Sequence, residues 1–264
     1  MSDYETILIE RDKRVARVSF NRPEKLNSFN GALRREFTRA AQEVNADDDI
    51  WVVVLTGVGR AFGAGADLTD ASEPMPNGGE GIEDQLNAEY KPGILAVHHA
   101  RKPWIAAVNG PCAGISYSYA MACDLMVMSE SGYLFQPFVG LGLVPDGGAT
   151  WLLPNFVGAK RAYELMAFGE KLSADKAVEW GLANRVLPDE GFAEHAMAFA
   201  QELANRSPLA LRCAKESISF GASHNLADTI SKEAALQAYC IESDDATEAI
   251  KAFFKKRNPE WKGR

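Results

Sequence analysis

Short apolar runs alternate with amphipathic stretches along the first two thirds of the chain. The segment Val15–Phe20 alternates between apolar and polar positions well enough to predict a strand. Three further segments are continuously apolar, the pattern of short strands buried on both faces of a parallel sheet: 50–55, 104–108 and 125–128. We therefore predict a sheet whose central strands are covered on both sides.

Helical periodicity follows the first predicted strand. Apolar residues recur every three to four positions from Leu33 to Val44, and Asn30 is placed to cap this helix. Short strands that alternate with such helices predict an α/β architecture built from crossover connections. The stretch 71–81 contains Ser, Pro, Asn and Gly, so we predict a mobile loop there, beside a site.

The strand patterns end near Ser207. The remaining chain shows helical patterns in three segments: 209–220, 226–241 and 245–256. We therefore predict two parts, an α/β core with the site in residues 1–206 and a helical region in residues 207–264.

Composition and charge narrow the class of protein. The chain has 264 residues, 47% of them hydrophobic, which suffices for one large domain. Its formal charge of −8 argues against a nucleic-acid partner, because such proteins present a basic face to the phosphates. No apolar run reaches the roughly 18 residues of a membrane helix, so we expect no membrane partner. Asp3 and Glu5 stand where a signal peptide would carry Lys or Arg, so we expect a cytoplasmic protein.

Cysteine and histidine spacing gives no metal-binding pattern. The four cysteines lie far apart without a Cys-x-x-Cys pair, which predicts reduced thiols. The four histidines do not cluster with them at ligand spacing, so we predict no metal site. A group of Lys and Arg residues within 255–264 could still bind the phosphates of a small ligand.

A first glycine-rich turn, 57–67, follows a predicted buried strand. Its glycines are wrongly spaced for a dinucleotide fingerprint, and Phe62 occupies the place of the third glycine. A tight turn explains the small residues. Alternatively, Gly63 and Gly65 allow main-chain N–H groups to approach a ligand and to stabilise charge on a carbonyl oxygen.

A second turn, 109–116, also follows a predicted strand and leads into a predicted helix, 117–123. A helix that begins here directs free N–H groups at whatever lies in front of it. The sequence from Gly114 to Ser118 has a serine in place of the closing glycine of a GxSxG elbow, with no ordered Asp and His partners. A serine hydrolase is therefore the weaker interpretation of this turn.

Taken together, these turns resemble the enoyl-CoA hydratase/isomerase (crotonase) superfamily. The similarity spans nearly the whole chain through four motifs in the family's order: 21–27, 60–68, 107–124 and 253–257. The resemblance implies a superhelix of repeated ββα turns with a C-terminal helical trimerisation region. It also implies a homotrimer or homohexamer that takes an acyl-CoA thioester as its substrate and needs no other cofactor.

The resemblance further implies an oxyanion hole formed by the main-chain N–H groups of Ala64 and Ile115. The family usually has glycine at the second place, so Ile115 is a departure that adds bulk to the pocket while keeping the donor. Contacts with the substrate or CoA are implied for a further set of residues: Arg22, Lys25, Leu26, Gly63, Gly65, Ala66, Asp67, Leu68, Gly114, Ser118, Phe138, Trp151 and Lys255. Within this set Asp67 is expected to be mainly structural, and Lys255 could instead complement a helix C-terminus.

The two glutamates with which hydratases of this superfamily handle water are missing. Ser118 stands at the first position and Phe138 at the second. Neither side chain is a useful acid or base at pH 7, so hydration by the usual mechanism is disfavoured.

Asp146 is the remaining candidate acid. It matches the glutamate of peroxisomal-type Δ3,Δ2-enoyl-CoA isomerases, and the run 140–187 is more similar to the epoxyphenylacetyl-CoA isomerases, which keep an aspartate there. We therefore predict an enoyl-CoA isomerase in which Asp146 moves the proton. The alternatives are an atypical hydratase, a CoA-binding protein without activity, and an Asp146 that merely caps a helix and has a lowered pKa.

Overall fold

The computed structural model describes residues 4–70 and 76–264. A six-stranded sheet forms its centre, with β1 antiparallel to β2 and every other neighbouring pair parallel. In spatial order its strands are β1 (Ile7–Asp12), β2 (Val15–Phe20), β3 (Val52–Gly57), β4 (Trp104–Val108), β6 (Leu125–Ser129) and β9 (Arg185–Leu187). The predicted α/β architecture is confirmed, with strands where the apolar runs placed them.

A small second sheet lies beyond the carboxyl ends of the central strands. It consists of β5 (Pro111–Ala113), β7 (Tyr133–Phe135) and β8 (Leu172–Ser173), with β7 between the other two. β5 follows β4 after only two residues, so the chain changes sheet at the second glycine-rich turn. This change of direction places the second glycine-rich turn between the two sheets.

Helices cover the central sheet on both faces. On one face, α8 (Phe192–Ala204) packs against a cluster formed by residues such as Val52, Val54 and Ile105. On the other face, the larger core contains an aromatic group in which Phe29 and Tyr119 stack with ring centroids 5.0 Å apart. The helices of the core are α1 (Gly31–Ala46), α2 (Gly78–Gln85), α3 (Lys91–His98), α4 (Ile115–Ala122), α5 (Ala149–Val157), α6 (Ala159–Phe168), α7 (Ala174–Glu179) and α8 (Phe192–Ala204).

One sequence prediction in this region was wrong. Residues 78–81 do not form a loop but begin α2, although three of them are glycines, which weaken a helix. α2 continues through a π-helical turn, η2 (Leu86–Tyr90), directly into α3, and this longer run supports the weak first turn. Residues 71–75 of the predicted loop lie outside the described residues.

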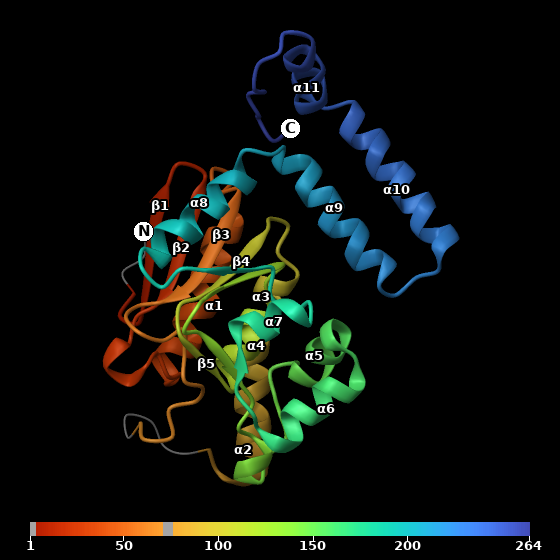
Figure 1. The fold of residues 1–264 in the computed structure, drawn as a ribbon. Coiled ribbons are helices and arrows are strands. Elements are labelled where there is room, and N and C mark those ends of the chain that lie inside the picture. The colour runs from red at the N-terminus through yellow and green to blue at the C-terminus, as the bar shows by residue number, and fades with distance from the viewer. Residues whose placement is uncertain (1–3, 71–75) are drawn as a thin grey trace.

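The last three helices extend away from the α/β core (Figure 1). They are α9 (Pro208–Gly221), α10 (Leu226–Ile241) and α11 (Asp244–Phe254), close to the predicted bounds. α10 buries none of its residues, and apolar side chains such as Leu226, Phe253 and Phe254 are each more than 70% exposed. The division of the chain at Ser207 and the oligomeric state stay predictions.

Within the described parts of the chain, no helix is long and apolar enough to cross a membrane.

Candidate active site

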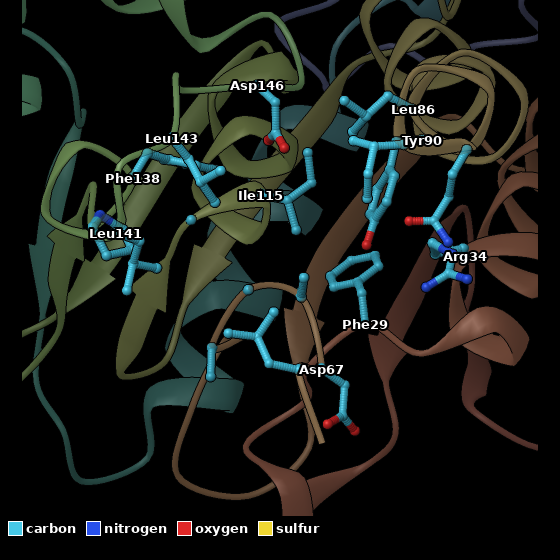
Figure 2. Close-up of a pocket in the computed structure, with 18 of the residues that line it drawn as sticks. Phe29, Arg34, Asp67, Leu86, Tyr90, Ile115, Phe138, Leu141, Leu143 and Asp146 are labelled. Carbon is cyan, nitrogen blue, oxygen red and sulfur yellow. The ribbon is translucent and has the colours of Figure 1, made fainter. Parts of the chain in front are cut away.

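A cavity of about 300 Å³ opens between the two glycine-rich turns, η2 and the segment that follows β7 (Figure 2). The structure brings together nine of the residues that the sequence assigned to a site: Ala64, Gly65, Ala66, Asp67, Leu68, Gly114, Ile115, Phe138 and Asp146. Segments more than 80 residues apart in the sequence therefore meet at one cavity, as the predicted acyl-CoA site requires.

Main-chain hydrogen bonds hold the two turns side by side. Gly63 N–H donates to the Pro111 carbonyl oxygen (3.2 Å), and Ala113 N–H donates to the Gly63 carbonyl oxygen (2.9 Å). The Ser116 hydroxyl accepts a further bond from Gly65 N–H at 3.1 Å. A Cβ atom on Gly63 would lie 2.8 Å from Ser116 Cβ and nearer still to Ser116 Oγ, so the contact requires glycine.

Two asparagine side chains support the turns from behind. The amide of Asn27 donates to the carbonyl oxygens of Val58 (3.0 Å) and Ala61 (2.7 Å), and its oxygen accepts from Arg22 N–H. Asn109 donates in the same way to the carbonyl oxygens of Gly57 and Gly59. These bonds fix the first turn to the N-terminal loop and to the end of β4.

The two predicted oxyanion donors differ in their surroundings. Ile115 is the first residue of α4, which begins after Gly114 (φ 55°), and its N–H has no acceptor among the described residues. Ala64 N–H, in contrast, donates to the carbonyl oxygen of Leu26 at 3.0 Å. A substrate oxygen would therefore find one open donor and one donor that it must share with Leu26.

Asp146 does not cap a helix. α5 begins at Ala149 with Gly148 as its N-cap, and no side chain caps it. The Asp146 main-chain carbonyl accepts from the Ser118 hydroxyl (2.9 Å) and from Ala149 N–H (3.1 Å), whereas its Oδ1 atom is buried without a hydrogen-bond partner. The capping alternative is therefore wrong.

The environment of Asp146 suits a base. Phe138, Leu143 and Ile115 line the same cavity, and burial there raises the pKa of Asp146 to about 6. A carboxyl group with this pKa is mostly ionised at pH 7 and remains a stronger base than an ordinary aspartate.

Asp67 has a different role. It forms an ion pair of 2.9 Å with Arg22 and accepts hydrogen bonds from Thr69 N–H and Oγ1. Burial alone would raise the pKa of Asp67, but the bonds from Thr69 and Arg22 outweigh burial and hold it below the usual value. These contacts agree with the structural role expected for Asp67.

The remaining predicted residues do not line the cavity: Arg22, Lys25, Leu26, Gly63, Ser118, Trp151 and Lys255. Trp151 is 59% exposed and contacts the ring of His98, and Lys255 lies at the end of α11. Gly63 and Ser118 support the site through the contacts described above. Direct contacts of these seven residues with CoA stay predictions.

Two buried polar residues of the cavity were missed by the sequence analysis. Arg34 and Tyr90 both line it, with exposed fractions of only 7% and 4%. A signal for Arg34 exists in the sequence, because it directly follows Leu33 on the predicted helix and lies three residues before Phe37, on the apolar side. Tyr90 lies in a segment without a clear periodic pattern.

Comparisons with known proteins identify the family of this chain. The family model described as "Enoyl-CoA hydratase/isomerase" matches residues 10–264. A probable enoyl-CoA hydratase of Rhodobacter capsulatus is 37% identical, with 99% of each chain covered. The 1,2-epoxyphenylacetyl-CoA isomerase of Escherichia coli is 36% identical over 98% of this chain and 99% of that protein. The crystal structure of an enoyl-CoA hydratase from Bacillus anthracis superposes with a TM-score of 0.93 at 32% identity, covering 98% of this chain and all of that one.

The chain therefore belongs to the enoyl-CoA hydratase/isomerase family and has the crotonase fold. It is an enzyme of a family that acts on acyl-CoA substrates, as the resemblance implied. The relatives include both proteins named hydratases and one named an isomerase, so the type of reaction depends on the residues of this cavity.

Proposed function

We propose that this enzyme is an enoyl-CoA isomerase, which moves a double bond of the acyl group from the 3 to the 2 position or carries out a related ring-epoxide isomerisation. The observation that carries the proposal is the Asp146 carboxyl group, which lies in a largely apolar cavity with one oxygen unpartnered. An aspartate in this state is able to accept a proton and return it.

The reaction needs a stabilised enolate and one base. Removal of a C2 proton places negative charge on the thioester oxygen, where the N–H of Ile115 and the shared N–H of Ala64 would hold it. Each such donor contributes about 2.7–4 kcal/mol to lowering the barrier. Asp146 takes the proton from C2 and delivers it to C4, so the double bond moves and no water is consumed.

The residues beside Asp146 argue against hydration. Ser118 is fully buried, and its hydroxyl is engaged with the Asp146 carbonyl. Phe138 lines the cavity but cannot transfer a proton. The side chains at both positions implied for the hydratase glutamates therefore leave an attacking water without its usual acid and base.

A hydratase with atypical residues is the second candidate, because several relatives carry that name. A CoA-binding protein without activity is the third. An isomerase would convert a 3-enoyl-CoA, a hydratase would add water to crotonyl-CoA, and a CoA-binding protein without activity would convert neither.

The test is to incubate the purified enzyme separately with a 3-enoyl-CoA and with crotonyl-CoA, and to analyse the products by chromatography and mass. We expect isomerisation of the 3-enoyl-CoA, and a loss of about 10³-fold in kcat when Asp146 is replaced by Asn. Asp48→Asn, which removes the same charge at an exposed position, is the matched control and should keep full activity. Water addition to crotonyl-CoA without isomerisation would contradict the proposal, as would equal activity of both variants.

A further inference from the structure

The wall of the cavity on the η2 side contains a tyrosine that the proposed proton shuttle does not use. Tyr90 ends the π-helical turn η2, and both Leu86 and Tyr90 of this turn line the cavity. π-helical turns are rare and occur often at functional sites. Figure 2 shows the Tyr90 ring extending along the cavity from Leu86 toward Phe29, on the other side of Ile115 from Asp146.

The Tyr90 hydroxyl is prepared as a hydrogen-bond donor. The guanidinium of Arg34 lies 5.5 Å from the centre of the Tyr90 ring and hydrogen bonds with the phenol. A guanidinium can only donate, so the phenol oxygen is the acceptor in that bond. The O–H hydrogen then has no acceptor among the residues that the structure describes.

The neighbouring groups keep this arrangement fixed. Arg34 is buried and forms an ion pair with Glu89 of the same π-helical turn. Phe29 packs against Tyr90 with ring centroids 6.1 Å apart, so the hydroxyl lies at the edge of an apolar surface. A donor in such a place is stabilised only when a ligand or a water accepts from it.

The Tyr90 phenol is protonated, as a hydrogen-bond donor must be. Burial is the main cause that raises the pKa of Tyr90 to about 12, and the charge of Asp146 adds to the effect. The phenol therefore keeps its hydrogen at every physiological pH. Tyr90 and Asp146 line the same cavity.

We propose that Tyr90 determines the acyl specificity of this enzyme by donating a hydrogen bond to a neutral oxygen on the acyl group, such as an ether, epoxide or carbonyl oxygen. The preferred substrate is then an oxygen-bearing enoyl-CoA and not a plain hydrocarbon one. A neutral oxygen fits better than a carboxylate, because Arg34 already has Glu89 as its counter-ion and Asp146 contributes a negative charge. The inference rests on the proposed function, which places the acyl group in this cavity.

The test uses saturated acyl-CoA ligands, which cannot isomerise. A series in which one ether oxygen replaces successive methylene groups is compared with the all-carbon chain, and dissociation constants are measured by titration calorimetry. We expect one oxygen position at which the native enzyme binds the ether about threefold to tenfold more tightly than its neighbours in the series. Tyr90→Phe should remove this preference by weakening the binding of that ether alone.

Tyr119→Phe is the matched control. It removes a hydroxyl from the same aromatic group, one that donates to the Tyr90 carbonyl at 3.4 Å but does not line the cavity. This variant should keep the preference for the ether.

Two results would overturn the inference: no oxygen position that the native enzyme prefers, or an equal loss of affinity for all ligands in Tyr90→Phe. Because the ligands are inert, a failed isomerase assay would leave the ether preference measurable. A working isomerase without the preference would refute only the role of Tyr90.

Discussion

Two of the walls of the cavity act through different parts of the chain, one through its main chain and the other through a side chain. On one wall, the turns around Gly63 and Gly114 present main-chain N–H groups, and the Ser116 side chain helps to hold the two turns together. On the other wall, the proposed proton transfer rests on the side chain of Asp146. The first wall should therefore be sensitive to changes in backbone geometry, and the second to changes in a single functional group.

Among the substitutions that change the main-chain wall, Gly63→Ala is expected to have the largest effect. The new Cβ atom would overlap Ser116, so the two turns must separate. We expect at least about a 100-fold decrease in kcat/KM, the size of losing one oxyanion donor, and a loss of about 1–3 kcal/mol in the free energy of unfolding. Steady-state kinetics and urea denaturation measure both effects.

Gly79→Ala is the control for this substitution, because nothing lies within 4 Å of the Cβ atom that it adds. Full activity of Gly63→Ala would show that the spacing of the turns does not matter for catalysis.

The pH dependence of kcat/KM tests the side-chain wall. The proposed mechanism needs Asp146 in its ionised form, and the pKa of Asp146 is raised to about 6. We expect kcat/KM for isomerisation to be level above pH 7 and to fall about tenfold per pH unit well below pH 6. A profile that stays flat down to pH 4.5 would argue against Asp146 as the base.

The free energy of unfolding should depend on the ionisation of Asp146 in the opposite way to activity: ionisation raises activity but lowers stability. A pKa that is higher in the folded state than the usual 3.8 means that folding is favoured while Asp146 is protonated, and that this stabilisation is lost as the pH rises from about 4 through 6. Asp146→Asn should therefore be more stable than the native enzyme by about 1–3 kcal/mol at pH 7.5, and nearly equal to it at pH 4. Urea denaturation at the two pH values measures the difference.

Asp67→Asn should change stability at neutral pH in the opposite direction, lowering the free energy of unfolding. The pKa of Asp67 is lowered in the folded state, so its charge stabilises the protein at neutral pH and this contribution is lost in acid. If both substitutions changed stability in the same direction at pH 7.5, the contrast between the two carboxyl groups would be wrong.

The smallest effect is expected from Ile115→Val. The N–H group of residue 115 survives the change, so kcat/KM should stay within about threefold of the native value, with a loss of roughly 0.5–1.5 kcal/mol in stability. A 100-fold loss of activity would mean that the Ile115 side chain, and not its main chain, carries the function of this wall.

Local patterns predicted the regular elements well. β2 and β4 have the predicted bounds, because continuous or alternating apolar residues directly reflect which faces of a strand are covered. The three strands of the small sheet were not predicted, since segments of two or three residues are too short to show a period. α2 was missed because its glycines oppose a helix and only the run into α3 supports it.

The site was only partly predictable for a related reason. Asp146 was predicted from a sequence motif. The hydrogen bond between Ala64 and Leu26, however, joins segments 38 positions apart and leaves no local signal in the sequence. The same holds for the contact of Arg34 with Tyr90. Pairings of this kind are set by the tertiary structure, so the coordinates were needed to find them.

The hydrogen bond from the Ser118 hydroxyl to the Asp146 carbonyl joins the position implied for a hydratase glutamate to the residue proposed as the base. Position 118 is where a hydratase of this family is expected to carry its first glutamate. In this chain the short hydroxyl that occupies it anchors the backbone of Asp146, the proposed base. Replacing Ser118 alone by glutamate would therefore remove the hydrogen bond that holds the Asp146 backbone. A redesign toward water addition therefore has to replace this anchor as well as supply carboxylates at positions 118 and 138.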